Sequence, residues 1–447
     1  MPLFEPPVGA IVRNGRGPSQ PSGKEGGPKP KGALRVLHTS DWHLGKTLGK
    51  VKRRHEEHRK FLDWLLGVIE SEGVDVLLVA GDVFDTIAPP VEAQGLYYAF
   101  LARAMRGPLR HAVITSGNHD SQAFLSAPRE LLRHLGAHVV AEPTENPGDE
   151  VISLNGPGGA PELIVAAVPF LKDRALLQAV EGEDQAARDA RLAEAVSGHY
   201  LKVAEIAGRL AKGTPVVAMG HLFARGGKVG EGGGEREPYV GSLSRIDAAR
   251  SFPGLFAYVA LGHLHSAQSV GSDRVRYSGS PIGMGFEDGG ASAKSVTILD
   301  IGPDGLEGFR ELRVPTFQEL LRVKGDLRAI EARISKLKAE GSAAWLEIVQ
   351  DLGEPLGDPG LVFGRMVEGS SMEILAIKDQ RAMDQALRHE GQGRKLKEYT
   401  VPEVFERALD AHKVEDPAKD ALRETFGMVL QMFEETGGDL PEGGAGQ

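Results

Sequence analysis

Cysteine is absent from the 447-residue sequence. Its absence excludes disulfide bonds, thiolate zinc sites and a cysteine nucleophile, so any metal ion must be bound by His, Asp, Glu or Asn. The sequence also lacks an apolar run of about 20 residues, the length that a membrane helix needs. Residues 1–17 are interrupted by Pro, Gly and Arg and do not have the apolar segment of a secretory signal. These absences predict a cytoplasmic protein that does not enter a membrane.

A surplus of positive charge is missing as well, because 62 acidic residues outnumber 52 basic ones and the net charge is −10. This balance argues against a protein that binds nucleic acid over a broad surface. It leaves room for a basic patch on one face, or for bound dications that reverse the local charge. The hydrophobic fraction of 41% is ordinary for a globular protein, and the length predicts two or three domains.

The composition divides the chain into segments. Residues 1–33 are rich in Pro, Gly, Ser and Lys and residues 437–447 are rich in Gly, so both are predicted to be disordered tails. From residue 34 to about 315, short apolar runs alternate with amphipathic segments of helix length, such as residues 53–72 and 91–106. This alternation predicts an α/β fold with a buried sheet and helices outside. The stretches 142–162 and 225–242 are predicted to be loops, the first around one short strand.

The pattern changes after residue 315. We expect a small α/β domain over residues 316–400, with a helix at 317–341 and strands at 343–352 and 372–380. A Gly/Pro-rich connection should join the two strands. Residues 401–436 are predicted to form two helices, and the second has an apolar stripe at helical spacing formed by Leu422, Phe426, Val429, Leu430 and Phe433.

Five apolar runs of the large domain each end in a small residue that is followed by metal-binding side chains. These side chains are Asp41, His43, Asp82, Asn118, His119, His221, His263 and His265. Ligands bind where the carboxyl ends of strands converge in an open α/β sheet, so we expect the side chains to meet at one edge. A single Gly-Asp or Gly-His pair is explained by a turn, but five such junctions are not. The other nine histidines are assigned structural or solvated roles, with His38 the least certain.

The number of ligands is too large for one ion and fits two. Mixed oxygen and imidazole donors suit Mn, Fe or Zn, whereas Mg prefers oxygen and keeps its waters. Two Mn²⁺ ions are therefore the first choice, with Fe or Zn as alternatives and Mg less suited.

The motifs "DWH", "GDVFD", "GNHD", "GH" and "GHLH" resemble those of the calcineurin-like metallophosphoesterase superfamily. The flanking stretches "LHTSDWHLGK", "GDVFDTIAPP", "TSGNHDS", "VPFLKDR", "GHLHSAQ" and "YSGSPI" are similar to its DNA-break repair branch, the bacterial SbcD family. The resemblance covers residues 34–315 and, more loosely, the C-terminal part. It implies a metallophosphoesterase β-sandwich flanked by helices over 34–315 and a DNA-selecting cap domain over 316–400. Residues 401–436 would then bind SbcC, an ABC-type ATPase.

The resemblance also implies roles for individual residues. The seven metal ligands would form two sets of three joined by one bridging carboxylate: Asp41, His43 and His265; Asn118, His221 and His263; and Asp82. His119 would contact the phosphate and stabilise the transition state or protonate the leaving oxygen. Asp120 would hold His119 in position. Asp85 matches the bacterial form of the second motif, where the archaeal form has a histidine.

The function implied is a manganese-dependent nuclease. It would act as a 3′–5′ exonuclease on double-strand ends and as an endonuclease on single strands and hairpins, in DNA repair with SbcC. One alternative is a phosphatase or phosphodiesterase for small molecules or phosphoproteins, and another is a scaffold that holds the ATPase on DNA ends. No Walker A motif is present, so any ATP dependence must come from the partner.

Three groups of residues that could form surfaces each have two possible interpretations. The resemblance implies a homodimer through the apolar faces of residues 53–72 and 91–106, but these faces can instead pack only on the sheet. The residues of the two faces are Phe61, Leu62, Leu65, Leu66, Leu96, Tyr97, Phe100 and Leu101. Basic residues of the small domain can contact DNA or form a solvated helix face: Arg322, Lys324, Arg333 and Lys336. The stripe in 401–436 can bind SbcC or cover the cap domain.

Overall fold

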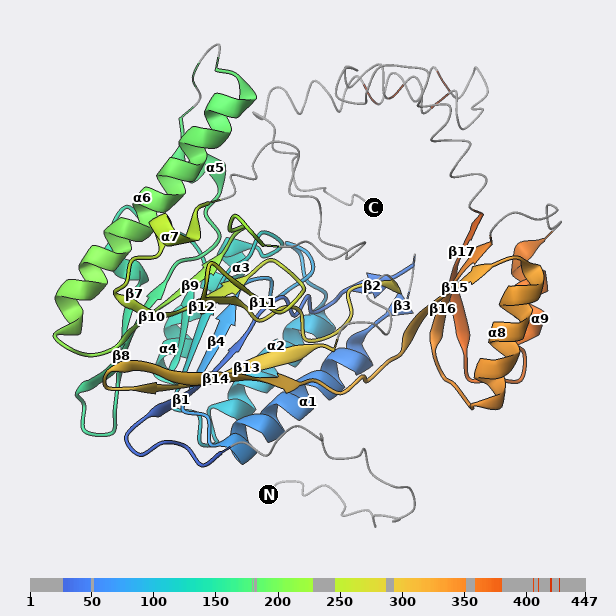
Figure 1. Cartoon of the computed structure of the whole chain (residues 1–447), viewed down its shortest axis with the longest axis horizontal. Helices are drawn as coiled ribbons and strands as arrows, with labels where there is room; N and C mark the ends of the chain where they lie inside the picture. Colours follow the sequence, from blue (N-terminus) through green and yellow to red (C-terminus); the bar gives the residue numbers. More distant parts are fainter. Residues whose placement is uncertain are drawn as a thin grey trace, which may run out of the picture. The chain divides into compact units, whose positions relative to one another are not determined.

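The structure is a computed structural model that describes residues 27–49, 52–178, 180, 183–227, 246–286, 293–350 and 358–379, with a few isolated positions beyond (Figure 1). Its large domain contains two six-stranded sheets that enclose an apolar layer. The order of the first sheet is β14 (Gly305–Arg313), β13 (Ser295–Gly302), β1 (Leu34–Thr39), β4 (Val76–Ala80), β5 (His111–Thr115) and β6 (Ala137–Val140). The order of the second is β11 (Gln268–Val270), β12 (Ser272–Tyr277), β10 (Phe256–Gly262), β9 (Val216–His221), β8 (Pro161–Ala167) and β7 (Val151–Asn155). The predicted α/β sandwich is confirmed.

The centre of each sheet is parallel, which brings the ends of its strands to one edge. Strands β1, β4, β5 and β6 pair in parallel in the first sheet. Strands β8, β9, β10 and β12 do so in the second. The five apolar runs identified in the sequence are β1, β4, β5, β9 and β10, and all of their residues except His111 and Ala257 are buried.

Helices cover the outer faces of the sheets (Figure 1). Helices α1 (His55–Glu72) and α2 (Val91–Ala104) share a core with the first sheet. The 27-residue α6 (Gln185–Ala211) packs on the second sheet. The shorter elements are β2 (Thr47–Leu48), β3 (Lys52–Arg53), α3 (Gln122–Ser126), α4 (Arg129–His134), the 3₁₀ helix η1 (Pro147–Glu150), α5 (Asp173–Leu176) and α7 (Ala248–Ser251).

Most of the apolar residues on α1 and α2 that were considered for dimerisation are buried inside this chain. The buried ones are Phe61, Leu62, Leu65, Tyr97, Phe100 and Leu101. Leu66 and Leu96 are only partly buried. The helix faces therefore serve mainly to cover the first sheet.

The small domain has a three-stranded sheet of β15 (Leu320–Gly325), β16 (Trp345–Gln350) and β17 (Glu373–Asp379), with helices α8 (Leu327–Ala339) and α9 (Pro359–Val367). The strand predictions at 343–352 and 372–380 are confirmed. The prediction of one helix over 317–341 is wrong for its first part, because residues 320–325 form a strand. All six of these residues pair in parallel with β16. The helix begins only after Asp326, whose carboxylate accepts a hydrogen bond from Ala329 N at 2.8 Å.

Helix α9 lies in the Gly/Pro-rich connection between the two predicted strands, where no helix was predicted. Asp358 caps it by accepting from Leu361 N at 3.0 Å, and Pro359 occupies its first turn. The Asp-Pro pair is therefore a helix-start signal within a stretch whose Gly and Pro content indicates a loop.

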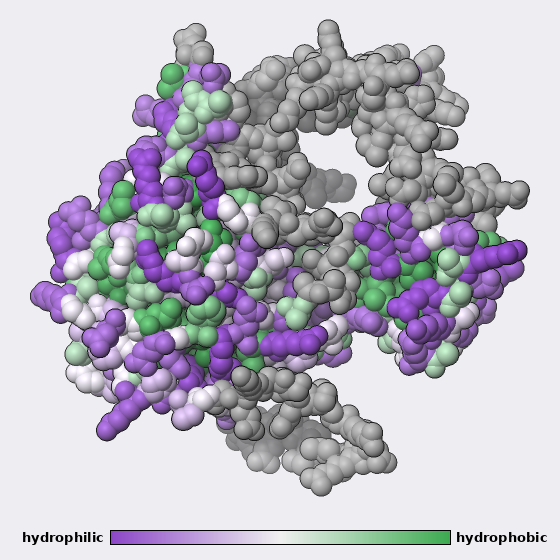
Figure 2. Space-filling view, in the orientation of Figure 1, coloured by the Kyte–Doolittle hydropathy of each residue, from purple (hydrophilic) through white to green (hydrophobic). Residues whose placement is uncertain are grey.

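Several predictions lie outside the described residues. They concern residues 1–26 and 437–447, most of the loop at 225–242, and the terminal helices with their apolar stripe, of which only Phe426 is described. Residues 27–33 are described, and the Lys29 ammonium pairs with Asp75. On the face seen in Figure 2, hydrophilic side chains surround small apolar areas. Within the described ranges, no helix combines the length and the apolar composition needed to cross a membrane.

Candidate metal centre

The side chains that follow β1, β4, β5, β9 and β10 meet at the carboxyl edge of the two sheets. The turns after β1 and β4 are joined by two backbone bonds, Asp41 N to Gly81 O and His43 N to Asp82 O, both 3.0 Å. His263, directly after β10, donates its backbone N–H to Asp41 Oδ1 at 3.0 Å. Residues more than two hundred positions apart are therefore in contact, as the sequence predicted.

Backbone strain is concentrated at this edge. Asp41 (φ 53°), His43 (φ 46°), Asp82 (φ 50°) and His263 (φ 101°) are four of the five non-glycine residues with positive φ in the described part of the chain. Such conformations cost on the order of 1–3 kcal/mol each and persist only where the surroundings impose them. Holding these four side chains in their orientations therefore lowers the stability of the fold.

A first group of donors comes from the ends of β1 and β10. Asp41, His43 and His265 each offer one atom, and these atoms lie within 4.8 Å of one another. The Nε2 atoms of His43 and His265 are 3.3 Å apart, and all three residues are buried. One cation can be held by this group.

A second group is centred on the amide oxygen of Asn118. This Oδ1 atom is 3.0 Å from His221 Nε2 and 3.1 Å from His263 Nδ1. His221 Nδ1 lies 3.0 Å from Ala80 O, which fixes the tautomer because a carbonyl oxygen only accepts. The Nε2 atom of His221 is thereby left as a ligand.

Asp82 lies between the two groups. Its Oδ2 atom is 3.6 Å from His43 Nε2 in the first group and 3.3 Å from His221 Nε2, the atom that adjoins Asn118 in the second. Burial opposes ionisation of this carboxyl, but His221 and His43 outweigh it and hold its pKa well below the ordinary value. Asp82 can thus reach both positions as a carboxylate.

The protonation of the centre indicates a need for cations. Burial raises the pKa of Asp41 to about 6, against the opposing effect of His221. Burial would lower the pKa of His221, but Asp82 and Asp41 raise it to about 9. A proton on His221 offsets part of the packed negative charge, and a metal ion would displace it. Two carboxylates, one amide and four imidazoles match the donor set of Mn, Fe or Zn.

His119 is held beside the two groups without belonging to either of the sets assigned from the sequence. Its backbone N–H donates to Asp82 Oδ1 at 2.9 Å, and its Nδ1–H donates to Asp85 O at 2.9 Å. Because Nδ1 is used in this way, Nε2 is the atom left for a substrate. Partial burial lowers the pKa of His119, although Asp82 acts in the opposite direction.

Asp120 orders the loop of His119 and does not contact its ring. Its carboxylate accepts from Gly117 N (2.9 Å), Phe84 N (2.9 Å) and Val83 N (3.1 Å). The loops that carry Asp82 and His119 are therefore joined through one buried side chain.

Asp85 acts on His43. Its Oδ1 atom lies 3.2 Å from His43 Nδ1 and 3.0 Å from the Lys46 ammonium. This contact directs the other ring nitrogen of His43 toward Asp82. Sequence reasoning missed Lys46, and it also missed Ser40 and Ser278, which contact each other at 2.8 Å beneath Asp41. The stretches "LHTSDWHLGK", which contains Ser40 and Lys46, and "YSGSPI", which contains Ser278, were the signals for them.

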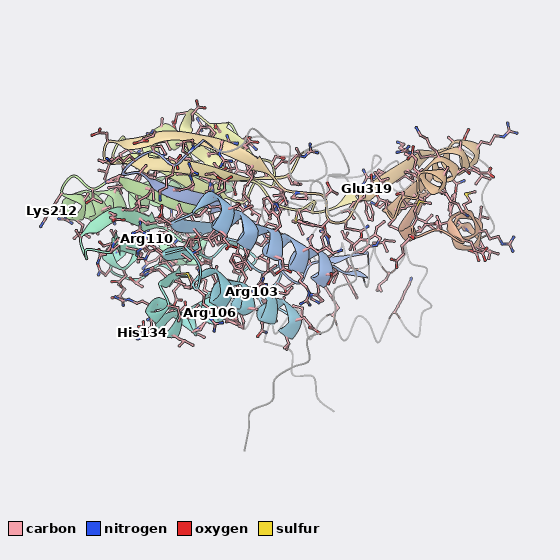
Figure 3. All side chains as sticks on the ribbon, turned by 90° about the horizontal axis from the view of Figure 1, so that it is seen from below. Arg103, Arg106, Arg110, His134, Lys212 and Glu319 are labelled. Carbon is pink, nitrogen blue, oxygen red and sulfur yellow. The ribbon has the colours of Figure 1, made fainter. Side chains whose placement is uncertain are left out.

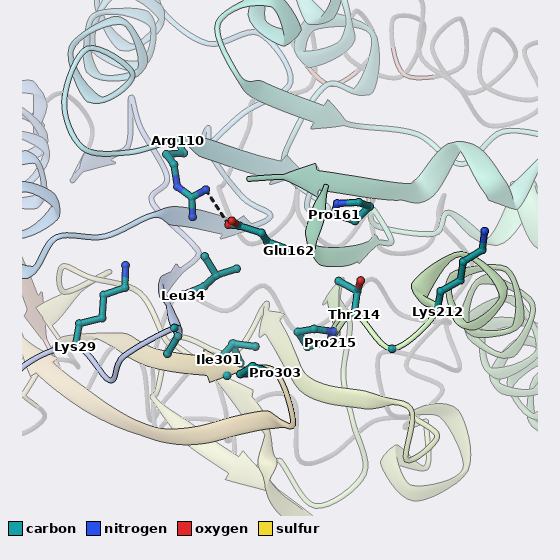
Figure 4. Close-up of a pocket in the computed structure, with 14 residues that line it drawn as sticks. Lys29, Leu34, Arg110, Pro161, Glu162, Lys212, Thr214, Pro215, Ile301 and Pro303 are labelled. Carbon is teal, nitrogen blue, oxygen red and sulfur yellow. Dashed lines mark ion pairs between the residues drawn. The ribbon is translucent and has the colours of Figure 1, made fainter. Parts of the chain in front are cut away.

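A separate cavity of about 540 Å³ lies away from these residues (Figure 4). Its lining includes Lys29, Arg110, Glu162 and Lys212, and Arg110 Nη1 pairs with Glu162 Oε2 at 2.8 Å. Arg110 and Lys212 lie at the end of the large domain seen on the left of Figure 3. None of the candidate metal ligands lines this cavity.

Comparisons with known proteins agree with this geometry. Residues 34–267 match the family model of calcineurin-like phosphoesterases. Residues 316–413 match the SbcD_C model, described as the type 5 capsule protein repressor C-terminal domain.

Relatives of known name match over most of their length. The chain is 33% identical over 404 residues to the D subunit of nuclease SbcCD from Escherichia coli (strain K12), covering 89% of this chain and 98% of that protein. It is 38% identical over 341 residues to the protein of the same name from Rhodobacter capsulatus (71% and 81%). The identity to that of Bacillus subtilis is 32% over 324 residues (70% and 78%).

Proposed function

The chain belongs to the SbcD family of calcineurin-like phosphoesterases, the nuclease subunits of SbcCD, and from this membership we propose how it cleaves DNA. It hydrolyses phosphodiesters with two Mn²⁺ ions. It acts as a 3′–5′ exonuclease on double-strand ends and as an endonuclease on single strands and hairpins. Its place is the cytoplasm, where it repairs double-strand breaks.

The observation that carries this proposal is the position of Asp82 between two groups of ligands. One ion would be held by Asp41, His43 and His265, and the other by Asn118, His221 and His263, with Asp82 within reach of both. The distances of 3.6 and 3.3 Å from Asp82 Oδ2 to one imidazole of each set support this assignment. Ions bound by these residues would supply an activated water and offset the charge on the phosphate oxygens.

The other residues orient the reaction. His119 presents Nε2 to the phosphate because its Nδ1–H is bound to Asp85 O. In its protonated form it donates to the departing oxygen or stabilises the charge on it. Asp120 keeps His119 and Asp82 in register through three backbone amides. Asp85 fixes the ring of His43.

Partners follow from the family. We propose that the chain assembles with the ATPase SbcC through residues 401–436 and that it dimerises through α1 and α2. Since most apolar side chains of α1 and α2 are buried within the chain, the dimer contact would use those left partly exposed. These are Trp64, Leu66, Leu96 and Tyr98.

The test uses the purified chain and linear duplex DNA labelled at one 3′ end. Release of labelled nucleotide is followed with Mn²⁺, with Mg²⁺ and with chelator. We expect release with Mn²⁺ that Asp82→Asn abolishes and that the matched variant Asp63→Asn retains, because Asp63 is a half-exposed carboxylate paired with Arg103 on the helical surface.

Release that survives chelation or the Asp82→Asn change would contradict the proposal. Hydrolysis of bis-p-nitrophenyl phosphate without any action on DNA would favour the small-substrate alternative. Addition of SbcC then decides whether DNA cleavage needs the partner.

A further inference from the structure

The inward face of β1 changes from apolar to polar as it approaches the metal centre. Side chains alternate along a strand, so Leu34, Val36, His38 and Ser40 point the same way. Leu34 and Val36 belong to the apolar layer between the sheets. His38 and Ser40 are fully buried and polar. A buried polar group is costly unless it is hydrogen-bonded, so both residues need partners in the opposite sheet.

Both residues find those partners. His38 Nδ1 is 3.0 Å from the hydroxyl of Tyr258 on β10. Ser40 Oγ is 2.8 Å from Oγ of Ser278, which follows β12 directly. Two successive inward side chains of the first sheet are thus bonded across the sandwich to the second.

The contact between Ser40 and Ser278 continues to a candidate metal ligand, Asp41. Ser40 Oγ donates to Asp41 Oδ2. An ionised carboxylate only accepts, and Ser40 has a single proton, so Ser278 donates in the 2.8 Å contact with Ser40, and its contact with Gly279 O at 3.3 Å is the longer and weaker one. Hydrogen bonds are therefore donated from Ser278 to Ser40 and from Ser40 to Asp41, and each bond strengthens the next.

Asp41 is held from a second direction as well. The backbone N–H of His263 lies 3.0 Å from its Oδ1 and 3.2 Å from its Oδ2. Both constraints on this carboxylate come from the second sheet, one through Ser278 and one through His263. Such constraints are what a residue with φ of 53° requires in order to keep its conformation.

We propose that Ser278 and Ser40 are positioning residues for the metal centre. Their paired hydroxyls hold the Asp41 carboxylate in the orientation that binds the first ion, and they fix the separation of the two sheets at the level where Asp41 meets His263. This inference rests on the proposed two-metal function. It adds the reason why a serine directly precedes Asp41 and why another follows β12.

The chain contains a matched comparison for this contact. Ser197 on α6 and Ser251 on α7 are also buried and also lie 2.8 Å apart through their hydroxyls. Ser197 donates to Ala193 O, and neither serine contacts a candidate metal ligand. Loss of that pair removes the same kind of hydrogen bond without touching Asp41.

The experiment compares Ser278→Ala with Ser251→Ala in the full chain. Calorimetric titration of the chelator-treated protein with Mn²⁺ gives the affinity, and thermal unfolding in chelator gives the stability. We expect both variants to lose stability and only Ser278→Ala to bind Mn²⁺ about 10–100-fold more weakly, as for other groups that orient metal ligands. Ser40→Ala should weaken binding in the same way, and Ser278→Thr should restore it because the hydroxyl is kept.

Wild-type Mn²⁺ affinity in Ser278→Ala and Ser40→Ala would overturn the inference and leave these serines with a purely structural role. Equal weakening in Ser251→Ala would overturn it too, since the effect would then follow from general destabilisation. A wild-type chain that binds no Mn²⁺ would overturn the manganese centre itself, which is a different failure.

Discussion

Asp85 Oδ1 lies 3.2 Å from His43 Nδ1, so the carboxylate holds the imidazole from the side opposite the metal centre. A carboxylate behind a metal-binding histidine fixes the tautomer and the orientation of the ring. Burial opposes ionisation of Asp85, but His43 and Lys46 outweigh it and lower its pKa. The contacts with His43 and Lys46 therefore favour the charged form of this side chain.

Removal of this carboxylate should weaken metal binding. We expect Asp85→Ala to reduce Mn²⁺ affinity about 10–100-fold, because the His43 ring is no longer held in one orientation. Asp85→Asn retains an acceptor oxygen and should lose less. Calorimetric titration measures both, and equal affinities in the two variants and the wild type would show that His43 is oriented by other contacts.

His119 should affect the rate and not the binding steps. His119→Asn removes the group that faces the phosphate, so kcat on duplex DNA should fall about 10²–10⁴-fold. Mn²⁺ affinity and DNA binding should stay near wild type, because none of the assigned metal ligands is changed. A fall in Mn²⁺ affinity that matches the fall in kcat would instead make His119 a metal ligand.

Asp120 should matter for stability even without metal. Three backbone N–H groups lose their acceptor in Asp120→Ala, and a buried donor left without a partner costs about 1–3 kcal/mol. The expected loss in the free energy of unfolding is about 3 kcal/mol or more, measured by urea unfolding in chelator. Asp63→Asn on the surface of α1 serves as the control and should change it by less than about 0.5 kcal/mol.

His38 should make the protein sensitive to acid. Burial, with help from Arg276, lowers its pKa from 6.5 to about 3. Below pH 6.5 the unfolded chain binds a proton at this residue and the native chain does not. The free energy of unfolding therefore falls as the pH decreases from about 6.5 toward 3, by up to about 1.4 kcal/mol per pH unit.

The test of this linkage is the slope of stability against pH. His38→Gln removes the titrating group, so its free energy of unfolding in chelator should fall less steeply than that of the wild type between pH 6.5 and 4.5. The other histidines are common to both proteins and do not affect the difference. Parallel slopes would mean that His38 is already protonated in the native state.

The five junctions of the metal centre were predictable because each is a local pattern. An apolar run, a small residue and a polar side chain stand next to one another in the sequence. Because the carboxyl ends of the strands converge at one edge, the polar side chains were predicted to meet there. The glycines have a reason that only the structure gives. A Cβ atom on Gly262 would lie 1.9 Å from Ala80 O, so β10 and β4 can approach each other only at a glycine.

Contacts between distant segments were not predictable in this way. Nothing local in the sequence connects Ser40 to Ser278, since their contact depends on how two sheets face each other. The strand β15 was mistaken for part of a helix for a similar reason: Leu320, Leu321 and Val323 fit a helical stripe, and the deciding factor is the parallel pairing with β16.

The division of the ligands between two sheets has a consequence for how the protein is made. Asp41, His43, Asp82 and Asn118 follow strands of the first sheet, whereas His221 ends strand β9 of the second sheet and His263 and His265 follow its strand β10. During synthesis these histidines leave the ribosome after the whole of the first set. A growing chain therefore holds an incomplete centre until residue 265 has emerged and the second sheet has closed on the first. With the ligands as we propose them, hydrolytic activity would be withheld from every shorter nascent chain.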